Sequence, residues 1–341
     1  MANPVKLSDI AEAMGVSSVT VSKALSDQKG VSEELRAKIK KMADEMGYVK
    51  PFAERKIRSD KSYNIGVLMS EKYLSKYDSF YWQLYQEVSK SAALKSCFIF
   101  IEVVSVADED TVTMPKLIRE RKADGVIVIG KLAKAYLAGL EEQDVPCVYL
   151  DFYEAAQKNA DAVISNSYYG TYLLTDYLYQ CGHRKIAFVG TTVATKSIMD
   201  RYMGYCKALA EHRLAIRSDY IVDDRTEDNS RMVEENEIRL PEDMPTAFVC
   251  NCDLTAGYMI KKLEKEGYHV PEDISVVGFD NYLYPGICDV GITTYDVDMA
   301  EMARKAISTI KKKISKAGYK SGIVLVEGRI IYRDSVKEIP F

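Results

Sequence analysis

The chain has 341 residues, 47% hydrophobic and 28% charged, which is the balance of a soluble globular protein with two or three compact units. No apolar run approaches the ~18 residues that a bilayer crossing needs, and the start lacks the apolar core of a signal peptide, so we expect a cytoplasmic protein. The net charge of −4 is uneven: residues 1–60 carry 11 basic and 9 acidic side chains, and the remainder carries 35 and 41. A slightly basic head on an acidic body is typical of a nucleic-acid-binding head.

The seven cysteines indicate neither a disulfide framework nor a metal centre. Their number is odd, and Cys250-x-Cys252 does not have the spacing of a zinc or redox pair. No histidine lies beside it at metal-ligand spacing. We therefore expect reduced structural thiols, no metal site and no cofactor.

Residues 5–25 predict two short helices joined by a glycine turn, the arrangement of a helix-turn-helix. The first helix is expected over 7–14, ended by Gly15, because glycine takes the left-handed turn conformation at no steric cost. Ser17 is a good N-cap for the second helix, and Val21 faces inward. The side chains left to face outward suit phosphates, base edges and the thymine methyl group; they are Ser18, Val19, Ser22 and Lys23.

A third helix and a basic segment complete the head. Ser32 is expected to cap that helix, its apolar side carries Leu35 and Ile39, and Gly47 is expected to end it. The segment 49–59 is too short to hold a helix in water by itself. On DNA it could fold, insert an apolar wedge between base steps and neutralise phosphates.

Beyond residue 62, short β-branched runs alternate with helical stretches, which predicts parallel sheets covered by helices on both faces. The expected strands are 64–69, 97–104, 125–129, 147–150, 185–189, 246–250 and 274–278, and the expected helices are 81–94, 168–181, 201–212 and 256–266. Two such sets imply two similar lobes in tandem. Ligands of open α/β sheets bind beyond the carboxyl ends of the strands, so one ligand would lie in the cleft between the lobes.

An enzyme is the competing interpretation of such a body. The first strand is followed by no Gly-x-Gly-x-x-Gly and no Walker lysine loop. The chain has three histidines, and no nucleophile and base stand at motif spacing. We expect no enzyme and no catalytic residue.

Particular motifs connect the chain to a known family. The head contains Ser8-Asp9-Ile10-Ala11, Gly15-Val16-Ser17, Thr20-Val21-Ser22-Lys23, Val31-Ser32-Glu33-Glu34 and Gly47-Tyr48. The body contains Ala123-Asp124-Gly125-Val126-Ile127, Cys181-Gly182-His183-Arg184-Lys185, Val270-Pro271-Glu272-Asp273-Ile274, Gly278-Phe279-Asp280-Asn281, Ile292-Thr293-Thr294-Tyr295 and Tyr332-Arg333-Asp334-Ser335. With these motifs, which extend over nearly the whole chain, the sequence resembles the LacI/GalR family of bacterial transcription regulators.

The resemblance implies a fold in three parts. Residues 1–48 would form a small all-α helix-turn-helix DNA-binding domain, and 49–61 a hinge. Residues 62–341 would form an effector-binding and dimerisation domain of the α/β periplasmic-binding-protein-like type I class, with two Rossmann-like lobes. Lobe one would take about 62–161 and 294–322, and lobe two about 162–291 and 323–341.

The resemblance also implies a homodimer that binds near-palindromic double-stranded operator DNA, with the hinge folding on the operator and Ile57 wedged into the minor groove. The implied DNA-binding residues are Ser8, Ser17, Ser18, Val19, Thr20, Ser22, Lys23, Arg55, Ile57 and Arg58. Three positions depart from the family pattern: Lys6 replaces a capping threonine, Lys23 a frequent arginine, and Ile57 a leucine. We therefore expect an operator that differs from the familiar ones. No leucine heptads follow Ser335, which favours a dimer over a tetramer.

The resemblance also implies that the protein is a repressor controlled by a small polar effector, a sugar or sugar derivative. The implied effector-binding residues are Phe80, Tyr81, Asp151, Arg201, Cys252, Asp280 and Tyr295. Asp280 would accept ligand hydroxyls, Arg201, just before a helix over 203–210, would donate to sugar oxygens, and the aromatic rings would form a wall. Taken singly, Asp280 could cap a turn, Arg201 could form a surface ion pair, and the aromatic residues could belong to the core.

One departure keeps the effector class open. Cys252 stands where many sugar-sensing members have an asparagine, and a thiol is a poor replacement as a hydrogen-bonding group. Asn251 lies one position earlier, where the strand would aim its side chain elsewhere. A nucleobase or another polar metabolite is an alternative effector, and a sugar-binding receptor without DNA function is an alternative role.

Overall fold

The structure, a computed structural model, describes residues 5–25, 28–46, 48, 62–74, 80–154, 161–227, 231–282, 286–316 and 319–340. Contacts between Cα atoms divide the chain into two compact units, Met1–Lys61 and Ser62–Phe341. The predicted hinge residues Arg55, Ile57 and Arg58 lie outside the described residues.

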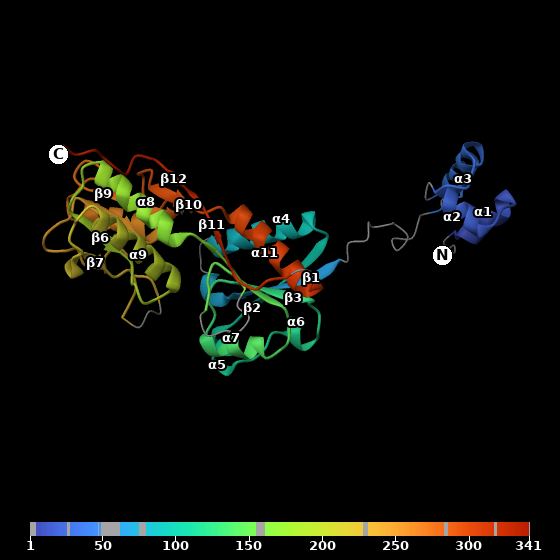
Figure 1. The fold of residues 1–341 in the computed structure, drawn as a ribbon, viewed down its shortest axis with the longest axis horizontal. Helices are drawn as coiled ribbons and strands as arrows, with labels where there is room; N and C mark the ends of the chain where they lie inside the picture. The colour runs from blue at the N-terminus through green and yellow to red at the C-terminus, as the bar shows by residue number, and fades with distance from the viewer. Residues whose placement is uncertain are drawn as a thin grey trace. The chain divides into compact units, whose positions relative to one another are not determined.

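The first unit contains the three predicted helices, α1 (Leu7–Met14), α2 (Ser18–Leu25) and α3 (Glu33–Glu45) (Figure 1). Gly15 ends α1 with φ of 62°, as the sequence predicts. The Ser17 hydroxyl accepts a hydrogen bond from the Thr20 backbone N–H at 3.1 Å, and the Ser32 hydroxyl accepts one from Leu35 at 3.4 Å. The helices pack around a small core of Ile10, Ala11, Val21, Ala24, Ile39 and Ala43.

An arginine that sequence reasoning did not single out joins α2 to α3. The buried Arg36 guanidinium donates to the backbone carbonyl of Gln28 at 2.9 Å and to those of Ala24 and Val31 at 3.4 Å each. A buried guanidinium requires such acceptors. The single side chain thereby connects the end of α2 to the segment before α3.

The first sheet of the second unit has six parallel strands in the order β11-β5-β4-β3-β1-β2. The strands are β1 (Tyr63–Ser70), β2 (Cys97–Val104), β3 (Gly125–Ile129), β4 (Cys147–Leu150), β5 (Ala162–Ser165) and β11 (Ile323–Val326). Alternate side chains of β1 point to opposite faces: Val67 packs toward α4 (Phe80–Leu94) and α11 (Met299–Ser315), and Leu68 packs in the cluster of α6 (Lys116–Arg119) and α7 (Lys134–Glu141) (Figure 1). Two short helices, η2 (Glu71–Tyr73) and α5 (Val106–Thr111), follow β1 and β2.

The second sheet has the order β12-β10-β9-β8-β6-β7, and its described pairs are parallel except β10 with β12. Its strands are β6 (Ile186–Val189), β7 (Ile221–Val222), β8 (Ala247–Cys250), β9 (Ser275–Asp280), β10 (Thr293–Asp296) and β12 (Arg329–Ile331). Helices α8 (Ser167–Gln180) and α9 (Lys196–Glu211) pack on one face, and α10 (Asp253–Lys265) on the other (Figure 1). The short helix η3 (Ser218–Tyr220) precedes β7. The predicted two-lobed α/β fold is confirmed.

The sheets correct three of the expected lobe boundaries. We expected 162–165 and 323–326 in lobe two, but β5 and β11 pair with each other at the edge of the first sheet. We expected 294–296 in lobe one, but β10 lies between β9 and β12 in the second sheet. Pairing between strands so far apart in sequence leaves no local pattern to read.

The start of α9 is a further correction. We expected this helix from residue 201 or 203, but it begins at Lys196, because the Thr195 hydroxyl caps it by accepting from the Ile198 N–H at 3.1 Å. Arg201 therefore lies inside the helix, on its buried side.

Candidate functional site

The outward face of α2 carries most of the residues proposed to contact DNA. Ser18, Val19 and Lys23 are exposed, as the sequence predicts, whereas Ser22 is half-buried. The exposed fraction of Val19 is 63%, which is high for an apolar side chain in such a small unit. Ser17 and Thr20 share a hydroxyl–hydroxyl hydrogen bond of 2.9 Å beside the cap, and the exposed Ser8 hydroxyl donates to Asp9 at 3.0 Å. An exposed methyl surface flanked by hydroxyls and a lysine matches a major-groove edge chemically.

The first helix has an unusual start at Lys6, one of the positions that departs from the family pattern. Its backbone N–H donates to the Asp9 carboxylate at 2.8 Å. Asp9 thus satisfies one free N–H of the helix start, and its negative charge suits the positive end of α1. The hydrogen bond from Lys6 also lowers the pKa of Asp9.

In the second unit, polar side chains gather at the carboxyl ends of the strands of both sheets. Asp151 directly follows β4, Cys252 follows β8, and Asp280 ends β9. Asp151 and Asp280 have positive φ angles, 69° and 97°. Such backbone conformations are unfavourable outside glycine and tend to be retained at functional sites.

Arg201 and Asp280 form a buried ion pair, with Nη2 and Oδ1 3.0 Å apart and side-chain exposures of 7% and 14%. The Arg201 Nε donates to the Ser167 hydroxyl at 3.4 Å, Nη1 donates to the Asn251 carbonyl, and the guanidinium lies 3.9 Å from the Phe279 ring centroid. These contacts fix the guanidinium on every side. The pair is therefore an interior one and not a surface ion pair.

Asp151 contributes a carboxyl from the first lobe. Its exposed fraction is 8%. Burial raises the pKa of Asp151 to about 7, and the Asp280 carboxylate adds to the rise, whereas the Arg201 guanidinium and a hydrogen bond with Tyr81 oppose it. Near neutral pH this carboxyl can therefore either donate or accept a hydrogen bond, which suits a ligand hydroxyl.

The two predicted aromatic residues of α4 differ in position. Tyr81 is half-buried, lies 4.3 Å from the Tyr73 ring centroid, and interacts with Asp151, Asp280 and Arg201 electrostatically. Phe80 is buried in the core, with its ring edge against Tyr81. Tyr81 is thus beside the polar group, and Phe80 supports it from behind.

Tyr295 does not join this group, which corrects the expectation that it contacts the effector. Its exposed fraction is 0%, and its hydroxyl accepts from the Gly328 N–H at 2.6 Å. Its ring packs on Phe279, with the centroids 4.9 Å apart. The residue is a core side chain, because β10 lies between β9 and β12 inside the second sheet.

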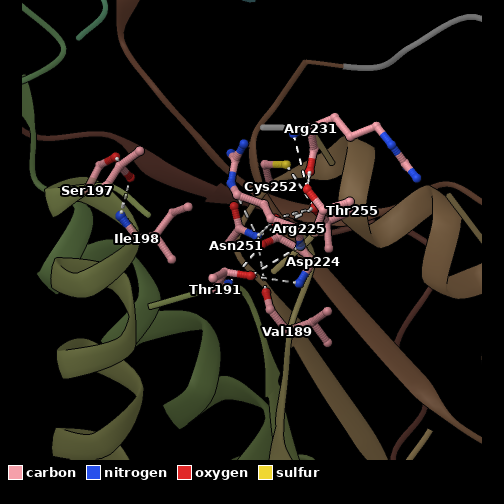
Figure 2. Close-up of polar contacts among 12 residues, drawn as sticks. Val189, Thr191, Ser197, Ile198, Asp224, Arg225, Arg231, Asn251, Cys252 and Thr255 are labelled. Atoms are coloured by element: carbon pink, nitrogen blue, oxygen red, sulfur yellow. Dashed lines mark hydrogen bonds and ion pairs between the residues drawn. The ribbon is translucent and has the colours of Figure 1, made fainter. Parts of the chain in front are cut away.

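Cys252 lies beside the site, and the Asn251 side chain turns away from it, as the sequence predicts. The Cys252 Sγ lies 3.3 Å from the Thr255 hydroxyl, and burial raises its pKa to about 12, so the thiol stays neutral. The Asn251 Nδ2 donates to Asp224 at 2.7 Å and to the Val189 carbonyl at 3.2 Å (Figure 2). The amide is therefore occupied within the second lobe.

Two pairs that sequence reasoning missed link the lobes near this group. The Tyr153 hydroxyl donates to Asp200 at 3.3 Å, and the Lys196 ammonium pairs with Glu154 at 2.7 Å. Tyr153 and Glu154 follow β4, whereas Asp200 and Lys196 belong to α9. Pairing across two lobes has no sequence signature, although their position just after Asp151 is a partial signal.

Two cavities border the site. The smaller, about 10 Å³, lies between the lobes and is lined by residues that include Asp151, Ser167, Ser197 and Asp200. The larger, about 540 Å³, lies where the chain crosses between the sheets, and its lining includes Gln83, Asp280, Asn281, Met299, Glu327 and Arg329. The larger volume falls in the range of small-molecule sites.

Within the described ranges, no group of three or more His, Cys, Asp or Glu side chains is arranged to hold a metal ion. None of the helices in those ranges has the length and apolar character that a membrane crossing requires.

Two family models match the chain. The model described as bacterial regulatory proteins, lacI family, matches residues 6–50, and a periplasmic binding protein-like domain matches residues 175–336. The HTH-type transcriptional repressor PurR of Vibrio campbellii is 25% identical over 335 residues, which cover 98% of this chain and 99% of that protein. PurR of Pectobacterium atrosepticum is 25% identical over 340 residues, with 98% of each chain covered.

Solved structures share the fold over almost the full length. The lac repressor dimer bound to operator and the anti-inducer ONPF has a TM-score of 0.67 and 21% identity, with 98% of this chain and 100% of that chain covered. The complex of the transcriptional regulator CelR with cellobiose has a TM-score of 0.67 and 18% identity, with 97% and 99% covered.

Proposed function

This chain belongs to the lacI family of bacterial regulatory proteins, and we propose that it is a repressor whose operator affinity changes when a small polar effector binds between its two lobes. The buried Arg201–Asp280 pair, with Asp151 opposite it at the strand ends of the other lobe, carries this proposal. The repressor works as a cytoplasmic homodimer, an assembly supported by the lac repressor dimer that shares its fold.

The DNA interface consists of α2, the start of α1 and the hinge. Ser17, Ser18, Val19, Thr20, Ser22 and Lys23 supply the α2 contacts, and Ser8 a contact from α1. Arg55, Ile57 and Arg58 supply the hinge contacts, with Ile57 as the wedge between base steps. Lys23 contacts one base edge or phosphate through its compact ammonium. A lysine does not reproduce the two parallel hydrogen bonds that an arginine forms.

The effector binds with polar groups from both lobes. Asp280 and Arg201 in lobe two and Asp151 in lobe one present an acceptor, a donor and a group that can do either. Tyr81 adds an aromatic surface beside them. Fixed acceptors and donors next to an aromatic ring are what a carbohydrate requires, and the relative CelR is seen with cellobiose.

Effector control follows from a difference in affinity. A ligand that contacts both lobes stabilises one lobe orientation, and it shifts the DNA-binding equilibrium only as far as its affinities for the two orientations differ. The Tyr153–Asp200 and Lys196–Glu154 contacts are part of the arrangement that such a shift would change.

A fluorescence anisotropy titration of genomic fragments, with and without candidate sugars, tests the proposal. We expect one or more fragments to bind specifically at physiological salt and one ligand to change that affinity. Lys23→Ala should weaken binding and lower the salt slope by about 1. Lys38→Ala removes the same charge from an exposed position of α3 and is the matched control. Equal losses of DNA affinity in the two variants would contradict the proposed DNA interface. The absence of any genomic fragment that binds specifically would contradict it as well.

The hinge has its own test. Ile57→Ala should lose specific operator affinity while effector binding, measured by thermal shift, stays unchanged. Undiminished operator affinity in this variant would remove the wedge role from Ile57. A nucleobase effector is the alternative, and the same thermal-shift screen with hypoxanthine and guanine separates it from a sugar.

A further inference from the structure

Arg225 occupies the effector side of the second lobe, although no sequence pattern drew attention to it. It lies three residues beyond the short strand β7, and its backbone forms an antiparallel bridge with Met232. Its backbone N–H donates to the Thr191 hydroxyl at 3.1 Å, just beyond the end of β6. Arg225 therefore lies near Cys252 (Figure 2), at the same edge of the sheet where β9 ends with Asp280.

The neighbouring carboxylate does not occupy the Arg225 donors. Asp224 is buried, and its oxygens accept from the Thr191 N–H at 2.8 Å, the Asn251 amide at 2.7 Å and the Thr255 hydroxyl at 3.3 Å (Figure 2). The Arg225 Nε lies 4.0 Å from the Asp224 Oδ1, which is too far for a hydrogen bond. Asp224 is thus satisfied by neutral donors.

The Arg225 guanidinium is only partly buried, but its Nε is enclosed. The side chain is 24% exposed, yet the Nε is buried and has no hydrogen-bond partner among the described residues. Buried donors in proteins nearly always have an acceptor, so one that lacks it requires an explanation. A ligand acceptor is the explanation that fits a side chain at the strand ends.

The positive charge of Arg225 acts on a residue of the first lobe. Burial raises the pKa of Tyr73 to about 12, the Glu109 carboxylate contributes to the rise, and the positive charge of Arg225 acts against it. Tyr73 belongs to η2 of lobe one, and its ring is tilted against Tyr81, with the centroids 4.3 Å apart. The Arg225 charge is therefore close to the lobe-one side of the site.

Two other cations near the effector site, Arg201 and Lys196, already have acceptors within the protein. All three Arg201 nitrogens donate to protein acceptors, and Lys196 is paired with Glu154. Of these three side chains, only Arg225 has a buried nitrogen, its Nε, without a hydrogen-bonded acceptor among the described residues. A planar guanidinium forms its strongest contacts with carboxylate and phosphate oxygens, often through two parallel hydrogen bonds.

We propose that the effector is an acidic carbohydrate, and that Arg225 binds its carboxylate or phosphate group while Asp280, Arg201 and Asp151 bind its hydroxyls. The inference rests on the proposed function, since it takes the effector site to lie between the lobes. It also accounts for Cys252 at the position where many sugar-sensing relatives have an asparagine. In this account Arg225 supplies the hydrogen-bond donors that the thiol at position 252 cannot supply.

The experiment measures binding to the full chain by thermal shift and calorimetry at matched ionic strength. The probes are inorganic phosphate, acetate, D-glucuronate and glucose 6-phosphate, with D-glucose as the neutral reference. We expect acidic probes to bind more tightly than D-glucose. Comparing glucuronate with glucose 6-phosphate shows whether the preferred acid is a carboxylate or a phosphate. Comparing glucuronate with acetate, and glucose 6-phosphate with phosphate, shows how much the sugar contributes.

Two arginine variants assign the contact. Arg225→Gln should weaken acidic probes about 10- to 100-fold, the usual range for hydrogen bonds to charged groups. Arg225→Lys keeps the charge but lacks the planar donors, so its affinity for acidic probes should lie between those of wild type and Arg225→Gln. Arg231→Gln is the matched control, because Arg231 lies in the same segment and pairs with Glu237 at 2.6 Å. Because the Arg225 Nε has no protein acceptor, Arg225→Gln should keep the wild-type melting temperature without probes.

The outcomes separate this inference from the proposed function. If acidic probes bind no better than D-glucose, or bind equally to wild type and Arg225→Gln, the inference is overturned. A neutral sugar that changes operator affinity without needing Arg225 also overturns it but upholds the proposed function. Acidic probes that bind through Arg225 without changing operator affinity support the inference and count against effector control of repression.

Discussion

Asp151 makes the stability of the second unit depend on pH in a direction that can be worked out. Its pKa in the folded protein is about 7, whereas an unperturbed aspartate has 3.8. A raised folded pKa means that the protonated carboxyl is the form stabilised by folding. Its contribution is fully present below pH 4 and is lost as the pH rises through 7. The pKa difference of about 3 between the folded and unfolded chain corresponds to about 4 kcal/mol of unfolding free energy between a pH below 4 and a pH above 7.

Asp151→Asn isolates this contribution. The amide is neutral at all pH values, keeps an oxygen for the contact with Tyr81, and tolerates the positive φ of this position. In urea unfolding of the full chain, we expect the variant to gain stability relative to wild type as the pH rises from 5 to 8. The stability difference should be about 2 kcal/mol at pH 5 and about 4 kcal/mol at pH 8. Asp110→Asn removes one exposed charge and is the control.

The reasoning is refuted if the stability difference between Asp151→Asn and wild type is the same at pH 5 and pH 8. A constant difference would mean that the carboxyl has the same charge in the folded and unfolded chain across this range. The result would also remove the basis for treating Asp151 as both donor and acceptor toward a ligand.

Two further predictions concern buried charges. Asp280→Asn, which tolerates the φ of 97° at this position, should destabilise the second unit by about 3–5 kcal/mol, because it leaves the Arg201 guanidinium buried without its carboxylate; urea unfolding measures this. The double variant Arg201→Met/Asp280→Asn should recover much of the loss, and a result equal to the sum of the two single variants would argue against direct coupling. In the head, Arg36→Met removes charged hydrogen bonds to three or more carbonyls and should cost about 2 kcal/mol. Hydrogen exchange should then speed up in α2 and α3, with Lys38→Met as the exposed control; unchanged exchange would show that Arg36 does not join these helices.

The sequence by itself determined the local features. Gly15 ends α1, and Ser17 and Ser32 cap the next two helices, because a positive φ and a free N–H at a helix start are requirements of a few adjacent residues. The strands β3 and β4 lie where their apolar runs predict, since a parallel strand covered on both faces must be apolar throughout. The bounds of β2 also match the prediction, although β2 is an edge strand with exposed residues. The family resemblance implied that Asp151, Arg201 and Asp280 share one site, and their positions at strand ends or on the buried side of a helix fit that expectation.

Only the tertiary structure decided which charged side chains are paired and which strands lie side by side. Arg201 and Asp280 are 79 positions apart, and their burial together, not their residue types, makes the pair an interior one. Tyr295 is a core residue because β10 lies within the second sheet, and the pairing of β5 with β11 moves both strands to lobe one. Arg225 follows a strand of two residues, too short for any pattern to reveal. The Arg225 Nε has no acceptor among the described residues because the Asp224 carboxylate accepts from Thr191, Asn251 and Thr255 instead. These contacts form only once the chain is folded.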